Sequence, residues 1–250
     1  MHTLINADCL DYLNGNRQTW ATIVADPPDN IGLGYQTYKD KLPDHQYVGL
    51  LETWLHLFIY RAKTVWFSFN AKWTFEVGRI VAEMVRRTDG LEAKPCVQTF
   101  TFGQHCHHDL GNNHRPLLRL RWSDAPLRPD AIRVPSWRQE NGEKRADPRG
   151  RVPSDVFDFT RVTGNSKQRR PWHPTQLNEG LVERCVKFTT PEGDSVLDPF
   201  GGTGTTLRVC RPLGYPSTLI EIDRGYCDKI VEEHGMKRSE YIHRALWECK

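Results

Sequence analysis

The sequence predicts an α/β protein with a doubly wound, mostly parallel sheet and helices on both faces. Two observations support this fold class. Short apolar runs of strand type alternate with segments of helical periodicity at both ends of the chain. The middle of the chain is basic and irregular, which predicts an insertion at one edge of the sheet. With 250 residues, the chain is long enough for one large domain with a sizeable core.

The first hundred residues alternate between the two patterns. Runs of apolar and β-branched residues predict strands. These strands are expected at 4–5, 22–25, 64–69 and 97–102. Apolar residues at helical spacing, such as Val48, Leu51, Leu55 and Phe58, predict helices between the strands. The helices are expected at 8–13, 46–60 and 75–85.

Residues 105–172 show neither pattern, because prolines, glycines and asparagines interrupt them. This segment holds 14 Lys and Arg against 8 Asp and Glu, whereas the whole chain has a net charge of only +3. Trp122, Trp137 and Trp172 are interleaved with the arginines. Basic and aromatic side chains together are typical of surfaces that bind a phosphate backbone and exposed bases. A solvated, Arg-rich loop region is the alternative.

The regular alternation returns after residue 176. Helices are expected at 177–188, 205–210 and 226–234. Strands are expected at 195–197 and 218–222. Strands that alternate with helices favour parallel pairing, because a parallel connection needs a crossover segment.

Composition limits the class of protein further. No apolar run approaches the ~18 residues of a membrane span, and the N-terminus lacks the pattern of a signal peptide. The 7 cysteines are scattered without a CxxC pair, which favours reduced thiols over a disulfide framework. We therefore expect a soluble protein of the cytoplasm.

The most informative segment is Asp198-Pro199-Phe200-Gly201-Gly202-Thr203-Gly204-Thr205, directly after the apolar run 195–197. Glycine lets backbone approach a ligand where a Cβ would block it. The helix expected from Thr205 turns free N–H groups and a positive dipole end toward the same place. A strand that turns through glycines into a helix therefore predicts a cofactor site.

A second motif, Asp26-Pro27-Pro28-Asp29, follows the strand expected at 22–25. Ligands of such sheets bind at the carboxyl ends of the strands, so Asp26 and the Gly202 turn can share one crevice. The two prolines remove two backbone donors and leave carboxylate and carbonyl acceptors. An acceptor-rich pocket suits a substrate amine that must lose a proton.

Four motifs in this order resemble one family. The chain is similar to the β-type exocyclic-amino DNA methyltransferases. The resemblance depends on Asp-Pro-Pro at 26–28, the basic insertion, His173-Pro174-Thr175-Gln176 and the glycine turn at 198–206. The resemblance implies a Rossmann-like methyltransferase domain formed by residues 1–104 and 171–250. It implies that residues 105–170 are an inserted target-recognition segment. It also implies S-adenosylmethionine as the cofactor, DNA as the substrate, and the cytoplasm of a prokaryotic or phage-infected cell as the location.

The resemblance assigns roles to residues of this chain. The catalytic motif is Asp26, Pro27, Pro28 and Asp29, in which Asp26 and the Pro27 carbonyl accept hydrogen bonds from the target amino group. Glu221 matches the acid that accepts from the ribose hydroxyls, and Asp8, followed by Cys9, matches the acid near the adenine ring. The methionine part of the cofactor is held by the remaining residues, with Asp26 beside them: His173, Thr175, Gln176, Asp198, Pro199, Phe200, Gly202, Gly204 and Thr205.

The implied chemistry is a direct in-line methyl transfer. The lone pair of an exocyclic amine is delocalised into the base, and two acceptors on its N–H groups favour a more tetrahedral nitrogen. Transfer from a sulfonium then needs mainly positioning and electrostatics. The base must be flipped out of a duplex, at a cost of roughly a few kcal/mol, or supplied single-stranded.

Asp29 departs from the family pattern, which has an aromatic residue there to stack on the flipped base. A stacking aromatic contributes ~1–3 kcal/mol per base, and a carboxylate cannot replace it. Asp29 could instead accept from a base edge, or Tyr35 or Tyr38 could stack on the base. Asp29 could also simply begin the turn before Asn30.

The leading prediction is N6-adenine methylation, because Asp-Pro-Pro is more typical of N6-adenine enzymes and Ser-Pro-Pro of N4-cytosine enzymes. N4-cytosine methylation is the alternative on the same scaffold. A DNA-binding homologue with weakened catalysis is a further alternative, because Asp29 replaces the aromatic residue.

Other features point to partners. Arg169 and Arg170 are predicted to contact DNA phosphates, with a solvated loop as the alternative. His105, Cys106, His107, His108 and Asp109 fit no zinc-finger spacing, so we predict a polar loop and no metal. The resemblance also implies a homodimer as one candidate assembly, because related β-type enzymes often form homodimers.

Overall fold

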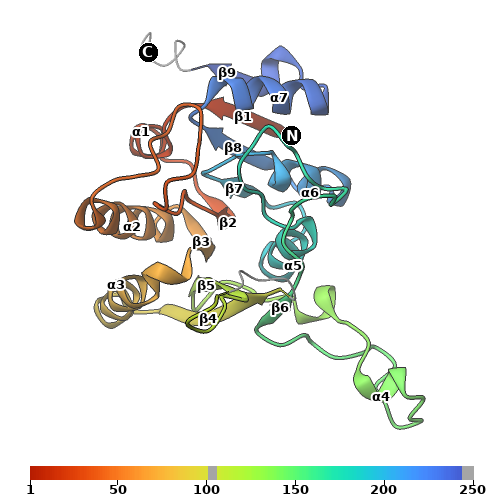
Figure 1. Cartoon of the computed structure of the whole chain (residues 1–250). Helices are drawn as coiled ribbons and strands as arrows, with labels where there is room; N and C mark the ends of the chain where they lie inside the picture. The colour runs from red at the N-terminus through yellow and green to blue at the C-terminus, as the bar shows by residue number, and fades with distance from the viewer. Residues whose placement is uncertain (101–105, 244–250) are drawn as a thin grey trace.

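The structure is a computed structural model that describes residues 1–100 and 106–243. Within this range it forms a nine-stranded sheet in the order β6-β4-β5-β3-β2-β7-β8-β1-β9 (Figure 1). The strands are β1 (His2–Asn6), β2 (Trp20–Ala25), β3 (Ala62–Ser68), β4 (Leu91–Thr99), β5 (His114–Trp122), β6 (Val156–Asp158), β7 (Val196–Asp198), β8 (Ser217–Glu221) and β9 (Tyr241–His243). Only β5 runs antiparallel to its neighbours among these strands, so the predicted α/β, mostly parallel fold is confirmed.

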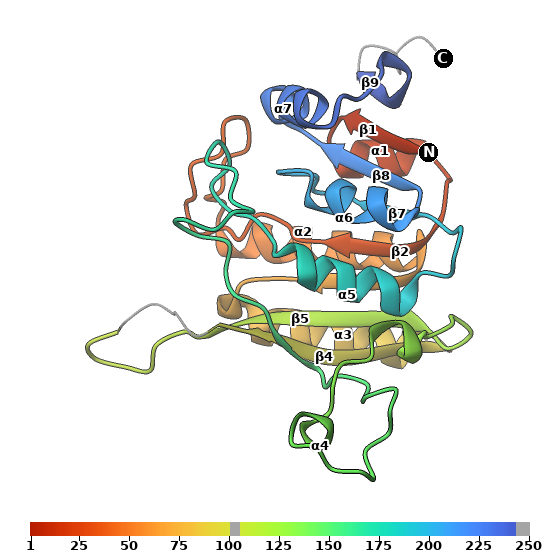
Figure 2. The ribbon, with the colours of Figure 1, turned by 90° about the vertical axis from the view of Figure 1, so that its right-hand side faces the viewer.

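Helices cover both faces of the sheet (Figures 1 and 2). They are α1 (Cys9–Gly15), α2 (Asp44–Ile59), α3 (Thr74–Arg87), α4 (Trp137–Glu140), α5 (Glu179–Thr189), α6 (Thr205–Leu213) and α7 (Arg224–His234), with 3-10 turns η1 (Ala71–Trp73), η2 (Pro129–Ile132) and η3 (Arg238–Glu240). Because side chains of a strand alternate between faces, Ile23 and Leu197 pack with α1, α2 and α3, whereas Val24 and Val196 pack with α5 and α6.

The expected strands at the two ends of the chain are present, with shifted bounds. The strand expected at 97–102 begins earlier, at Leu91, and ends at Thr99. The expectation of a strand reaching 102 extends beyond Phe100 into residues outside the described range. The prediction missed β9, a three-residue strand at the edge beside β1. Such a short edge strand carries too few residues for a period to show.

The prediction that residues 105–172 are irregular is wrong for β5, which lies inside the sheet between β3 and β4. Its sequence contains the alternation Leu118-Arg119-Leu120-Arg121, with both leucines buried. The arginines made this run resemble a basic loop. The Arg119 guanidinium lies over the Trp66 and Phe188 rings, at 6.0 and 5.5 Å from their centroids, so its side chain covers apolar surface.

The segment after β5 does leave the sheet. It carries η2 and α4 and projects away from the α/β body before returning as β6 at the edge (Figures 1 and 2). Most of its arginines pair with nearby acids, for example Arg133 with Asp130 and Arg149 with Asp147. None of the helices in the described part of the chain is long and apolar enough to cross a membrane.

Candidate active site

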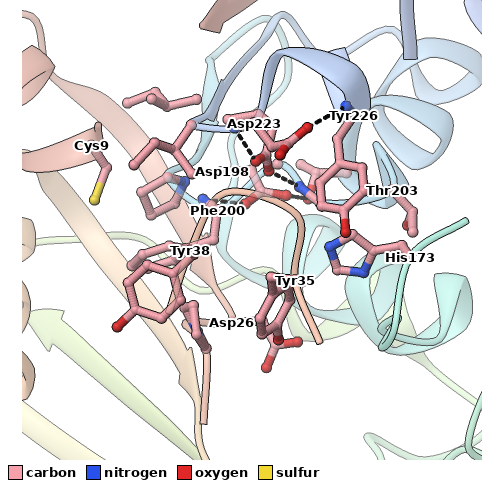
Figure 3. Close-up of a pocket in the computed structure, with 18 of the residues that line it drawn as sticks. Cys9, Asp26, Tyr35, Tyr38, His173, Asp198, Phe200, Thr203, Asp223 and Tyr226 are labelled. Carbon is pink, nitrogen blue, oxygen red and sulfur yellow. Dashed lines mark hydrogen bonds between the residues drawn. The ribbon is translucent and has the colours of Figure 1, made fainter. Parts of the chain in front are cut away.

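Four acidic residues meet at one edge of the sheet. Asp26 follows β2, Asp198 ends β7, Glu221 ends β8, and Asp8 follows β1. These four strands are consecutive in the sheet and parallel, so their carboxyl ends lie side by side. All four acids line one pocket, in which Cys9 lies at one side, His173 and Tyr226 lie at the other, and Asp26 and Tyr35 lie between them (Figure 3).

The glycine turn forms one wall of this pocket. The Asp198 carboxylate holds the turn, because its Oδ1 accepts from the Phe200 N–H at 3.0 Å and its Oδ2 from the Thr206 hydroxyl at 2.6 Å. Burial raises the pKa of Asp198 to about 6. Gly202 has φ 50°, and a Cβ there would lie 3.4 Å from His173 Nε2. The turn therefore needs glycine both for its left-handed backbone and for its approach to His173.

Glu221 is a buried carboxylate with two backbone donors. Its Oε2 accepts from the Gly202 N–H at 2.7 Å and its Oε1 from the Asp223 N–H at 2.8 Å. Burial raises the pKa of Glu221 to about 7, although both N–H donors favour the ionised form. Asp223 beside it caps α7 by accepting from the Tyr226 N–H at 3.0 Å. The pocket thus places a further acid next to the one predicted from the sequence.

The segment 173–176 closes the pocket opposite α2. His173 Nδ1 lies 2.5 Å from the Thr175 carbonyl oxygen, and burial lowers the His173 pKa to about 4. The ring is therefore neutral near pH 7 and packs against Tyr226 with centroids 4.7 Å apart. Gln176 lines the pocket, but its amide also holds the preceding loop by donating to the Gln168 carbonyl at 2.6 Å.

The loop that carries Tyr35 and Tyr38 is organised around the buried Asp40. The Asp40 carboxylate accepts from the N–H groups of Asn30 at 2.7 Å, Ile31 at 3.2 Å and Leu33 at 2.9 Å. Tyr38 lines the pocket of the four acids, on the same side as Asp8 and Cys9. Tyr35 faces both this pocket and a second one.

The second pocket shares a wall with the first. Asp26, Tyr35 and Thr175 belong to both, whereas Pro27, Asp29 and Phe100 line only the second. The Tyr47 hydroxyl donates to the Pro28 carbonyl, and Trp73 Nε1 donates to the Asp29 carbonyl at 2.8 Å. No donor in the described part of the chain reaches the Pro27 carbonyl. An open carbonyl and the Asp26 carboxylate therefore lie together at the junction of the two pockets.

The side chain of Asp29 is buried and does not stand alone. Its two oxygens accept from Arg115 Nη1 and Nη2, each at 2.8 Å, and Arg115 Nη2 also donates to Asp26 Oδ1 at 2.8 Å. Burial raises the pKa of Asp26, and the neighbouring Arg115 opposes that rise. The acid found in place of an aromatic residue is thus part of an ion cluster with the catalytic candidate.

Several predicted residues lie away from the pockets. Gly204 is not in either wall; it caps α6 with φ 76°, and a Cβ there would lie 3.3 Å from Ile230. Arg170 is paired with Glu233 on α7, with Nη2 at 2.5 Å from Oε1. His105 lies outside the described residues, and among those described no three His, Cys, Asp or Glu side chains group as metal ligands.

Sequence reasoning missed residues that reach the site from unexpected elements. Arg115 comes from β5, the strand that was not predicted. Phe100 lines the second pocket, with the Arg161 guanidinium 5.3 Å from its ring centroid. Asp223 and Tyr226 follow Glu221 closely, so the pattern acid-x-acid before a helix was the available signal for both.

The fold and the pockets define a protein that binds a ligand at the carboxyl edge of a parallel sheet. A family profile described as DNA methylase, of the N6 and N4 type, matches residues 21–233. The chain therefore belongs to the N6/N4 DNA methylase family, whose cofactor is S-adenosylmethionine. The resemblance stated from the motifs is confirmed.

Individual proteins similar to this chain are also methyltransferases. The type II methyltransferase M.HpaI of Haemophilus parainfluenzae is 31% identical over 218 residues, which cover 84% of this chain and 66% of that protein. The aligned region thus spans just under two thirds of M.HpaI. The DNA adenine methyltransferase YhdJ of Escherichia coli is 28% identical over 262 residues, covering 90% of this chain and 79% of that protein.

Solved structures share the fold. The M1.HpyAVI complex with S-adenosylmethionine matches with a TM-score of 0.64 at 18% identity, covering 94% of this chain and 100% of that one. The cytosine-N4-specific PvuII DNA methyltransferase matches with a TM-score of 0.66 at 13% identity, covering 92% and 86%. At such identities the likeness concerns the fold.

Proposed function

We propose that this chain transfers a methyl group from S-adenosylmethionine to the exocyclic N6 of adenine in DNA. The observation that carries the proposal is the position of Asp26. It lies at the junction of a pocket lined by the glycine turn and a second pocket lined by the Asp-Pro-Pro motif. A methyl donor in the first pocket and a base in the second would meet there.

The first pocket fits the proposed cofactor. Gly202 leaves space beside His173 that a Cβ would narrow, and the buried Glu221 offers acceptor oxygens for sugar hydroxyls. Asp8 and Cys9 form the far end of the pocket, where the adenine ring would lie, and Ile222, an exposed apolar residue, borders the same pocket. The acidic lining also suits the positive charge of a sulfonium.

The chain's own residues would prepare the target nitrogen. When bound, S-adenosylmethionine supplies an electrophilic methyl group on a good leaving group. The Asp26 carboxylate and the Pro27 carbonyl each accept one N–H of the target amine, which directs the nitrogen lone pair toward the methyl carbon. As the new N–C bond forms, the bond between the methyl carbon and the sulfur would break, leaving the neutral thioether S-adenosylhomocysteine, and the positive charge would pass to the nitrogen, which then loses one proton, finally to solvent. Asp26 stabilises that developing charge.

The second pocket is where we place the flipped base. Among the described residues of its lining, Tyr35, Phe100 and His114 carry aromatic rings, and Tyr35 and Phe100 are the candidates that we propose for stacking in place of the aromatic residue that Asp29 replaces. Tyr38 lines only the cofactor side and is less suited to this role. Stacking of a base on an aromatic ring contributes about 1–3 kcal/mol.

Adenine is favoured by the Asp-Pro-Pro motif and by the likeness to an adenine-specific relative over most of both chains. N4-cytosine methylation is the second candidate, because the family profile that matches this chain covers the N4 type as well as the N6 type. Both targets present an amine conjugated with a ring, so the same acceptors serve either.

The inserted segment is proposed to recognise the DNA sequence. The part between β5 and β6 projects from the body, and Lys144, Arg145 and Arg151 there have no ion pair among the described residues. Arg169 remains a proposed phosphate contact. Arg170 would have to leave Glu233 to reach a phosphate, so its assignment has less support. Residues 1–104 and 171–250 would then form the catalytic domain, with β5 of the insertion completing its sheet.

The test is transfer of a radiolabelled methyl group to unmethylated DNA, followed by digestion to nucleosides and mass spectrometry. N6-methyladenine is the expected product, N4-methylcytosine would select the second candidate, and no methylated base on any DNA tested would refute the proposal. Asp26→Ala should lower transfer by at least ~100-fold while cofactor affinity stays within about threefold. The variant should fold, because Asp29 still pairs with Arg115.

A further inference from the structure

Asp29, Arg115, Ser68 and Asp26 form a closed network at the base of the second pocket. Arg115 uses both of its terminal nitrogens on Asp29, and Nη2 reaches Asp26 as well. Its Nε donates to the Ser68 hydroxyl at 2.6 Å, and that hydroxyl hydrogen-bonds Asp26 in turn. The network therefore connects the end of β2, the end of β3 and β5 through side chains alone.

The carboxylates of Asp29 and Asp26 both hold the guanidinium of Arg115 in place. A guanidinium that makes two parallel bonds to one carboxylate has its plane set by that partner. The partner is itself held, because Trp73 Nε1 donates to the Asp29 carbonyl at 2.8 Å. The side chains of Arg115 and Asp29 are 20% and 9% exposed, so water competes little for these bonds. Arg115 thus has one orientation available while Asp29 is present.

This arrangement limits what Asp26 can do. A carboxylate has about four acceptor positions. Arg115 and Ser68 use two of them, which leaves about two for a substrate, and Asp26 lines both pockets. Without Asp29, the Arg115 cation would be balanced by Asp26 alone, and the acceptor strength of Asp26 toward a substrate would fall. With Asp29, the three charged groups carry a net charge of −1.

We propose that Asp29 and Arg115 are positioning residues, which together hold the Asp26 carboxylate in its accepting orientation and leave the cluster of three charged groups net negative toward the target amine. Asp29 then acts through Arg115 and not by contacting the base. The inference rests on the proposed function of Asp26, and it explains why an acid can occupy a position where the family has an aromatic residue.

The pH dependence provides a signed readout. The groups that face Asp26 are Arg115 and Asp29 in the network, Asp198 on β7, and the Ser68 and Tyr35 hydroxyl groups. The negative charge of Asp29 raises the pKa of Asp26, so Asp29→Asn should lower that pKa. The acid limb of the rate profile should move to lower pH for the same reason.

The experiment is a double-mutant cycle in single-turnover methyl transfer to DNA. Asp29→Asn and Arg115→Gln should each lower the rate by about 10- to 100-fold, with adenosine affinity within threefold of the wild type. Because Asp29 acts through Arg115, the double variant should be no more than about threefold slower than the slower single variant. Asp29→Glu, which keeps the charge, should restore part of the loss. The matched control is Glu92→Gln, which removes the ion pair of Arg121, another arginine of β5, and should leave the rate unchanged.

A second measurement does not depend on activity. Carbon-13 NMR titration of the Asp26 carboxyl, assigned with Asp26→Asn, should show a lower pKa in Asp29→Asn than in the wild type. The proposal is overturned by an unchanged Asp26 titration, by a wild-type rate in Asp29→Asn, or by single effects that multiply in the double variant. A shifted Asp26 titration in a wild-type protein that methylates no DNA would instead refute the proposed function and leave the network intact.

Discussion

Cofactor binding should become tighter as the pH rises through neutrality, because Glu221 must be ionised to accept from the ribose. Its pKa is raised to about 7 by burial. About 9% of the Glu221 side chains are then ionised at pH 6 and about 91% at pH 8. A ligand that needs the ionised form therefore gains about tenfold in affinity over this range. The two N–H groups of Gly202 and Asp223 already occupy Glu221, so additional donors from a ligand favour the carboxylate further.

Adenosine is the appropriate ligand for this measurement, since it carries both ribose hydroxyls and no amino group that titrates between pH 6 and 8. Isothermal titration calorimetry should show its Kd falling about tenfold over that range. Asp198, with a pKa of about 6, adds at most about twofold, and His173, with a pKa of about 4, is neutral throughout.

Two controls isolate Glu221. In Glu221→Gln the tenfold dependence should shrink to the twofold part that belongs to Asp198, and 2′,3′-dideoxyadenosine should show the same small dependence on the wild-type protein. Thermal unfolding of the variant reports the backbone hydrogen bond that the amide cannot replace, a loss of about 1–3 kcal/mol. An adenosine Kd that is constant between pH 6 and 8, or a full dependence that survives in Glu221→Gln, would refute the reasoning.

Two further predictions concern the backbone of the site. Asp40→Ala removes the acceptor of three loop N–H groups and should lower the free energy of unfolding by ~2–4 kcal/mol in urea titrations. Asp40→Asn should lower it less, because the amide keeps one acceptor oxygen. Equal losses in the two variants would contradict this account. Gly202→Ala adds a Cβ at 3.4 Å from His173 and should weaken adenosine binding about tenfold, whereas Gly214→Ala has the same left-handed strain with no neighbour within 4 Å and should lower stability only.

The parts of the site that the sequence predicts are those with a local cause. Asp26 directly follows β2 and Asp198 ends β7, two buried strands that are neighbours in the sheet, and a proline after each acid marks the turn. Pattern, turn chemistry and the rule that ligands bind at the carboxyl ends of strands are then enough to bring the two acids together. No long-range pairing had to be known in detail.

Arg115 could not be found in this way, because its role depends on pairing between distant segments. It lies 86 residues after Asp29, on a strand whose arginines resemble those of a basic loop. Only the antiparallel insertion of β5 between β3 and β4 brings Arg115 beside Ser68 and Asp29. The same pairing places Arg119 over Trp66, so one strand contributes two of its positive charges to the interior side of the protein rather than to DNA.

The burial of Arg115 affects the interpretation of both the basic segment 105–172 and the catalytic motif that contains Asp29. A positive count along residues 105–172 indicates nucleic-acid binding only for side chains that keep their charge available, and Arg115 does not. Asp29, taken alone, removes a stacking ring from the catalytic motif. Taken with Arg115, it supplies the counter-charge that lets a buried cation lie against Asp26 without neutralising it. A buried Asp29 carboxylate without Arg115 would have no cation to pair with, and a buried Arg115 without Asp29 would have only Asp26 as its counter-charge. Both arrangements cost free energy, so we regard the two residues as a single feature of this active site.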